Sequence, residues 1–287
     1  MKRVVIIWAG ALVLVLNASG QRIAVDVLPG VINYSGDLQP SALTLSEARP
    51  ALQVGLSVGL TEKLFLRAFY LVGTVHGDDK KNGAVRSVSR NLNFTSAIGE
   101  GSLTMEYDVL NAAEQGKITP YIFAGGGFYH FNPYTYDTTG KKAYLMPLST
   151  EGEGLPEYPD RKPYTLYQFN LIGGFGLKYR VSDRLAIGFE VGFRKLFTDY
   201  LDDVSNTYVD KNILLKERGA EAVALAYRGG ELNPLKPYPR AGAPRGNPTA
   251  NDYYYTGLLR FTYRLGGGNN GFNLRGKNSV GCPRNVL

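Results

Sequence analysis

Seven ionisable residues lie in stretches of the sequence that are otherwise built of apolar and small side chains. They carry both signs of charge: Arg67, Glu100, Glu106, Lys178, Glu190, Arg194 and Arg260. Acids and bases enclosed in one interior can form a buried network of ion pairs. The same residues could instead line a path for ions. The elements that hold them must decide between the two.

Two other kinds of chemistry have weaker support. The chain has two histidines, His76 and His130, and His76 lies close to Asp78-Asp79, with Ser87 or Ser89 as a nearby nucleophile. A triad needs these groups in contact, and nothing in the spacing fixes such a geometry. The sequence therefore predicts no catalytic residue and no enzyme.

Paired acids at Asp78-Asp79 and Asp202-Asp203 could bind calcium, which takes several carboxylate and carbonyl oxygens. Neither pair has the spaced ligands of a dedicated calcium loop. Turn formation and loop solvation are the favoured interpretations. No metal ion and no other cofactor is predicted.

The clearest positioning element is the stretch from Tyr167 to Phe197, which predicts two long strands joined by residues 181–184. Apolar residues recur at every second position of each strand, with aromatic residues at both ends of the apolar face. This alternation holds for about fifteen residues per strand, whereas strands of soluble proteins average about five or six. The pattern is typical of strands that cross a bilayer.

The same alternation predicts eight strands. They cover residues 23–34, 52–60, 64–75, 92–109, 118–131, 167–180, 185–197 and 253–265. Pro29-Gly30 interrupts the first strand and suggests a bulge or an edge position. The third strand is apolar on both faces apart from Arg67 and Thr74, so its inward face stays open. Long and shorter connections alternate, which puts long loops outside the cell and short turns in the periplasm if the mature N-terminus is periplasmic.

A secreted soluble barrel of lipocalin type is the alternative. Its outer face should carry many long charged side chains, whereas the less apolar face here is mostly Gly, Ala, Ser and Thr. The sequence therefore favours an all-β fold, an eight-stranded antiparallel transmembrane barrel in contact with outer-membrane lipid. Eight strands leave an interior just wide enough for side chains, so the seven charges are expected to fill it rather than conduct ions.

The two ends of the chain lie outside this barrel. Lys2 and Arg3, the apolar residues 4–16 and Ala18-Ser19-Gly20 form a secretory signal pattern. The predicted domains are a signal peptide at 1–20, the barrel at 21–265 and a periplasmic C-terminal tail at 266–287. The net charge of +7 comes from scattered residues rather than from a basic stripe, so no nucleic-acid partner is predicted.

The tail carries the only cysteine, Cys282. A single cysteine in a secreted chain indicates a free thiol or an intermolecular disulfide. One interpretation is a thiol on a disordered tail. The other is a tail whose Cys282, Pro283 and Arg284 bind a partner, with a disulfide between Cys282 and that partner.

Several segments resemble the PorG family, the outer-membrane barrel component of the type IX secretion system of Bacteroidetes. They are Asn33–Leu38, Gly77-Asp78-Asp79, Thr119–Gly125, Phe197–Ser205 and Arg245–Pro248. The resemblance implies a non-enzymatic subunit that anchors or positions a periplasmic ring, built from a PorK-like lipoprotein and a PorN-like protein. The alternative is an OmpX-like surface barrel whose extracellular loops bind an external ligand or a host surface.

Overall fold

The computed structural model describes residues 22–39, 44–81, 85–110 and 117–265. The predicted signal peptide at 1–20 lies outside the described residues. So do residues 266–287, with the predicted partner-binding residues Cys282, Pro283 and Arg284.

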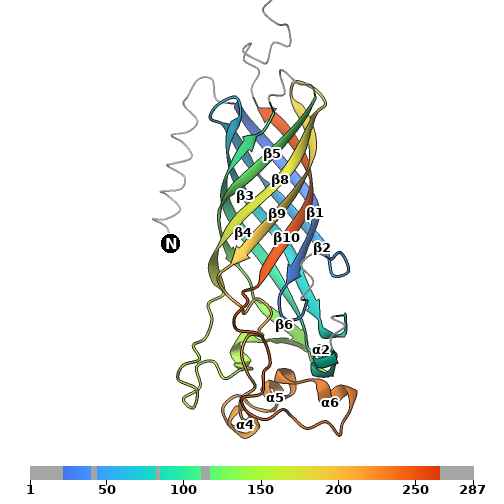
Figure 1. Ribbon diagram of the computed structural model, residues 1–287, viewed down its shortest axis with the longest axis vertical. Helices are drawn as coiled ribbons and strands as arrows, with labels where there is room; N and C mark the ends of the chain where they lie inside the picture. The colour runs from blue at the N-terminus through green and yellow to red at the C-terminus, as the bar shows by residue number, and fades with distance from the viewer. Residues whose placement is uncertain (1–21, 40–43, 82–84, 111–116, 266–287) are drawn as a thin grey trace, which may run out of the picture.

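Eight long antiparallel strands form a closed barrel (Figure 1). They are β1 (Arg22–Ser35), β2 (Arg49–Gly59), β3 (Leu64–Asp78), β4 (Asn93–Asp108), β5 (Ile118–His130), β8 (Tyr167–Arg180), β9 (Leu185–Leu196) and β10 (Tyr253–Leu265). Each strand pairs with its neighbours in chain order, and β1 pairs with β10 to close the ring. The predicted fold class and strand positions are confirmed.

Alternation sorts the barrel side chains into an apolar exterior and a closed interior. On β8, Phe169 is 69% and Phe175 is 55% exposed, whereas Asn170 is 2% exposed. Exterior apolar residues of β5 run from Ile118 to Phe128. These ten steps cover about 33 Å of strand, or about 25 Å along the barrel axis at a tilt of about 40°, which matches the apolar band of a transmembrane barrel. No helix within the described residues is long and apolar enough to span a bilayer.

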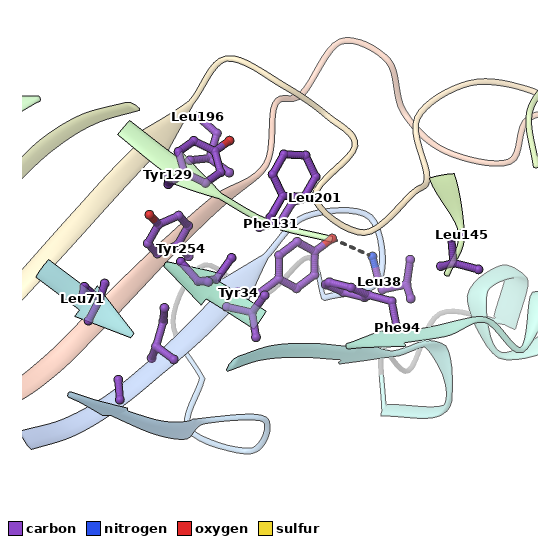
Figure 2. Packing of buried hydrophobic residues seen from close by; sticks show 14 of the residues in the cluster. Tyr34, Leu38, Leu71, Phe94, Tyr129, Phe131, Leu145, Leu196, Leu201 and Tyr254 are labelled. Atoms are coloured by element: carbon purple, nitrogen blue, oxygen red, sulfur yellow. Dashed lines mark hydrogen bonds between the residues drawn. The ribbon is translucent and has the colours of Figure 1, made fainter. Parts of the chain in front are cut away.

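The barrel interior differs between its two halves. The half nearer the short turns holds most of the charged residues, whereas the half nearer the long loops is mainly apolar and continues into the loops (Figure 2). β3 contributes Phe69, Leu71 and Val75 to this apolar half. The structure thus settles the open question of which face of the third strand points inward: it is the face that also carries Arg67.

The first strand has no bulge and is not at an edge, so that prediction was wrong. β1 pairs with β2 from Arg22 to Ile32 and with β10 on its other side. Pairing with β10 is interrupted only at Leu28 and Pro29, and the register is the same before and after the gap. A closed barrel has no edge strand, and the barrel tolerates the missing N–H of proline as a local gap in one ladder.

All four long connections lie at one end of the barrel, opposite the short turns, as the alternation of lengths predicted (Figure 1). We call this assembly the cap; it comprises the described residues of 36–48, 79–92, 131–166 and 197–252. The sequence predicted loops here, but the cap contains regular structure. Its elements are η1 (Asp79–Lys81), α2 (Val85–Arg90), β6 (Pro133–Tyr136), β7 (Lys142–Tyr144), η2 (Met146–Leu148), α4 (Lys211–Arg218), α5 (Ala220–Ala226) and α6 (Gly229–Leu232).

The cap has an apolar core of its own. Asp210 caps α4 by accepting hydrogen bonds from the backbone amides of Asn212 and Ile213. α4 and α5 then bury Leu214 and Ala222 against Leu155 and Val209, which come from two different loops. Short helices such as these depend on tertiary packing for their stability.

Candidate functional site

Glu106 lies at the centre of a charged cluster in the half of the barrel nearer the short turns. One carboxylate oxygen is 3.1 Å from Nη1 of Arg67 and also accepts from Nη1 of Arg260. The other is 2.7 Å from Nζ of Lys178. Glu106, Arg67 and Arg260 are each at most 2% exposed. The single buried carboxylate of Glu106 thus forms ion pairs with three cations.

The cluster extends to every strand of the barrel. Arg67 also pairs with Glu190 at 2.7 Å, and the hydroxyl of Tyr121 donates to Glu190 at 2.9 Å. Arg260 pairs with Asp26 at 2.8 Å. With the hydroxyl of Ser57, which donates to Asp26, the cluster takes one residue from each of the eight strands. We call it the lumen network: Asp26, Ser57, Arg67, Glu106, Tyr121, Lys178, Glu190 and Arg260.

The other two predicted lumen residues form a second, smaller group nearer the cap. The guanidinium Nε of Arg194 is 3.5 Å from Glu100. Asn170 donates to Glu100 at 2.7 Å, and Nη1 of Arg194 donates to Thr256 at 2.6 Å. The structure therefore places all seven predicted residues inside the barrel, in two groups.

Sequence reasoning missed two acids of the interior. Asp26 accepts from Arg260, and Asp108 lies 2.6 Å from Nζ of Lys178. Asp26 alternates with Ala24 and Leu28 on the inward face of β1. This alternation was the signal that could have identified it. Asp108 lies two residues after Glu106 on β4, so its side chain is on the same inward face.

A barrel filled in this way should not conduct ions. We expect the purified protein to give no unitary current steps in a planar lipid bilayer, because buried ion pairs and the apolar half leave no continuous aqueous path. A porin inserted in the same bilayer is the positive control. Reproducible steps of one size from the protein alone would contradict a filled lumen.

A second polar cluster lies in the cap, where segments distant in the sequence meet. Arg245 donates to Glu151 at 2.9 Å and to the carbonyl oxygen of Ala226 at 3.1 Å. The carboxylate of Glu151 also accepts from the backbone amides of Ser205 and Asn206, at 3.0 and 2.8 Å. Arg245 and Glu151 are both buried. These contacts join three parts of the cap.

The same cluster reaches the first loop and the end of β3. Asp37 accepts from the backbone amide of Asn247 at 2.9 Å. Arg90 pairs with Asp79 at 2.6 Å and donates to the carbonyl oxygen of Arg245. Parts of four segments therefore meet in this cluster: Asn33–Leu38, Gly77-Asp78-Asp79, Phe197–Ser205 and Arg245–Pro248.

Acids outnumber bases in this cluster, and several acids hold raised pKa values. Burial raises the pKa of Asp199 to about 8, opposed in part by the hydroxyl of Ser205. Burial and the charges of Asp203 and Glu151 raise the pKa of Glu153 to about 8. Burial would lower the pKa of Arg245, but the charges of Glu151 and Asp203 outweigh it and raise that pKa. The cap therefore holds protonated carboxyl groups at neutral pH.

This arrangement predicts that the cap loses stability as the pH rises. Asp199 has a pKa of about 3.9 when unfolded and about 8 when folded, so its stabilising effect is complete below pH 4 and is lost as the pH rises through 8. Between these values the population of opened cap should rise by up to about tenfold per pH unit for each such group. Limited proteolysis between pH 6 and pH 9, normalised to an unfolded substrate, measures this change.

Two variants make the pH test specific. Asp199→Asn removes one titrating carboxyl and should flatten the pH dependence of cleavage. Asp160→Asn changes an exposed acid of the same cap and should leave the dependence as in the natural chain. Equal normalised cleavage of the natural chain at pH 6 and pH 9 would contradict the raised pKa values.

The candidate catalytic and calcium residues have other partners. Nδ1 of His76 is 3.0 Å from the hydroxyl oxygen of Thr95, and Nε2 lies 3.5 Å from Glu47. His130 packs against the ring of Tyr167 at 4.6 Å. Asp79 pairs with Arg90, and Asp203 accepts from the hydroxyl of Tyr164 at 2.7 Å. Within the described residues, no group of His, Cys, Asp and Glu side chains has metal-binding geometry.

Comparisons with known proteins identify a family for the chain and several structures of similar fold. A family model described as a domain of unknown function (DUF6089) matches residues 2–147, just over half of the chain. No curated protein matches the chain significantly.

Solved structures similar to the chain include outer-membrane and bacterial surface proteins. Ail of Yersinia pestis is 7% identical over 86% of this chain and 100% of its own, with a TM-score of 0.41. Neisserial surface protein A is 9% identical over 86% and 98%, with a TM-score of 0.41. OprG of Pseudomonas aeruginosa is 10% identical over 86% and 95%, with a TM-score of 0.33. The likeness is one of fold alone.

Proposed function

The chain belongs to the DUF6089 family, whose domain has no assigned function, and we propose that it is a structural, non-enzymatic subunit of the type IX secretion system. One observation carries the proposal: an ion network from all eight strands fills the barrel, so the chain offers no route for a protein substrate. Cargo would need a separate, larger barrel. The resemblance of five segments to the PorG family is the reason for proposing the type IX secretion system in particular.

In this role the barrel anchors a periplasmic ring of a PorK-like lipoprotein and a PorN-like protein at the outer membrane. The ring would meet the end with the short turns, since residues 60–63 and 181–184 and both ends of the described chain lie there. The tail at 266–287 is the proposed contact, with Cys282 able to form a disulfide to the partner. Cys282→Ser should then remove a high-mass band from non-reducing gels of native membranes.

Deleting residues 266–287 tests the secretion role. We expect the deletion to abolish secretion and ring association while the barrel, which ends at Leu265, still folds and inserts. The folded fraction is measured by the band shift between unheated and heated samples on a denaturing gel. Normal secretion by a folded, inserted deletion variant would exclude the tail as the contact.

A surface-binding role is the second candidate, and the folded cap favours it. The cap exposes large apolar residues at its far end, with Leu232 49% and Leu235 90% exposed. Polar substitutions at these two positions should reduce binding to a host surface on this second interpretation. They should leave secretion unchanged on the first.

A further inference from the structure

β6 extends the wall of the barrel beyond its apolar band. Thr95 of β4 pairs with Tyr134 in the same register by which β4 pairs with β5. Alternation puts Tyr134 and Tyr136 on the exterior side, in line with Phe128 of β5. Thr135, between the two tyrosines, is on the other face and is buried. The hairpin therefore presents one face to the surroundings, as a continuation of the membrane-facing wall.

β7 completes this face. Tyr134 pairs with Tyr144, and Tyr136 pairs with Lys142, so the four side chains lie on the same side of the hairpin. Tyr136 is 53% and Tyr144 is 45% exposed, and the intervening Ala143 is buried. We call Tyr134, Tyr136, Lys142 and Tyr144 the hairpin face.

Its positive charge is fixed in place and has no anionic partner. Nζ of Lys142 lies 3.6 Å from the ring centre of Tyr134 and 4.8 Å from that of Tyr144. Tyr144 also raises the pKa of Lys142, so the ammonium stays charged. Across the described part of the chain, no carboxylate forms an ion pair with Lys142, whereas the adjacent Lys141 pairs with Glu221 at 3.3 Å.

The height of the hairpin face sets which molecules it meets. Phe128 contacts Phe169 and Tyr167, with ring centres 5.0 and 6.0 Å apart, and these rings form an aromatic girdle at the edge of the apolar band. Tyr134 follows Phe128 by six residues, about 20 Å along the tilted strand. At a tilt of about 40° this is about 15 Å along the barrel axis, so the hairpin face lies beyond the hydrocarbon, at a height that a large saccharide headgroup reaches and a phospholipid headgroup layer of about 5–8 Å does not.

We infer that the hairpin face binds the phosphorylated saccharide headgroup of a glycolipid in the outer leaflet. Tyrosine rings offer flat apolar surfaces to the C–H faces of sugars, and a positioned ammonium can donate to a phosphate oxygen. The face continues the lipid-contacting wall of the barrel. Four side chains are too few for a stable protein interface, which takes about 20–30 residues from each partner.

Binding of bis-phosphorylated lipid A to the full mature chain in detergent micelles tests this inference. We expect tighter binding of this lipid than of dephosphorylated lipid A or phosphatidylglycerol, since one lacks the phosphates and the other lacks the sugar. Lys142→Gln should weaken binding about tenfold, as expected when one hydrogen bond to a charged group is lost. Lys141→Gln is the matched control and should leave binding within twofold.

A second pair of variants tests the aromatic contribution. Tyr144→Ala should weaken binding of lipid A, whereas Tyr107→Ala should not, although both tyrosines are 45% exposed and Tyr107 lies at the opposite end of the barrel. All four positions are exposed, and the gel band shift confirms that each variant folds. Equal affinity for phosphatidylglycerol and lipid A would overturn the inference. So would equal effects of the Lys141 and Lys142 variants, or of the Tyr107 and Tyr144 variants.

Discussion

Replacing Glu106 with alanine should lower the free energy of unfolding of the barrel by about 3–5 kcal/mol. The carboxylate pairs with Arg67, Lys178 and Arg260, and the first and last of these are almost fully buried. Removing it leaves each of these cations with one acid, Glu190, Asp108 and Asp26 respectively, and takes away an acceptor that the two buried guanidinium groups cannot replace. Each lost hydrogen bond to a charged group costs about 1.5–3 kcal/mol, and the acids that remain offset part of this loss.

Urea unfolding in lipid vesicles measures the Glu106 effect, with the gel band shift reporting the folded fraction. The band shift suits this protein because its only tryptophan, Trp8, lies in the predicted signal peptide. Asp183→Ala removes an exposed carboxylate from a short turn and should change the free energy of unfolding by less than about 0.5 kcal/mol. A Glu106→Ala barrel as stable as the Asp183→Ala barrel would show that the lumen network does not hold the strands together.

Replacing Arg245 with alanine should open the cap and leave the barrel closed. Arg245 is 3% exposed, pairs with Glu151 and donates to backbone oxygens of Ala226 and Asp203. Its loss leaves the carboxylate of Glu151 buried without its cation. We expect a loss of about 3–5 kcal/mol in the free energy of cap opening.

Hydrogen exchange locates the Arg245 effect. Amides in residues 131–166 and 197–252 should exchange faster, while amides of β1 to β5 keep their protection. Arg240→Ala changes an exposed arginine in the same loop and should leave exchange unchanged. Faster exchange throughout the barrel strands would mean that the cap and the barrel unfold together, and would contradict an effect confined to the cap.

The barrel was predictable from the sequence because its signal is local. In β8 and β9, the alternation of apolar and less apolar residues indicates which side chains face lipid. Eight strands with this alternation predict a closed barrel. β3 was the exception, and its reason is physical. Phe69, Leu71 and Val75 face inward to form the apolar half of the interior, while Tyr70 and Val72 face lipid. When both faces of a strand are apolar, its sequence shows no alternation that would indicate which face points inward.

The cap could not be predicted in the same way. Its longest helix has eight residues, and helices this short gain their stability from contacts between loops. Residues 37, 151 and 245 are far apart in the sequence and come from three different loops. The motif segments were assigned by resemblance alone, and their burial gives them a structural role as the joint between loops. The proposed contact with a periplasmic ring is at the opposite end of the barrel.

The most direct test of the proposed secretion role is chemical crosslinking in intact cell envelopes, followed by affinity purification of the tagged chain. Recovery of a PorK-like lipoprotein, with crosslinks to residues 60–63, 181–184 or the tail, is the predicted result. Recovery of the folded barrel without any periplasmic ring protein would contradict it.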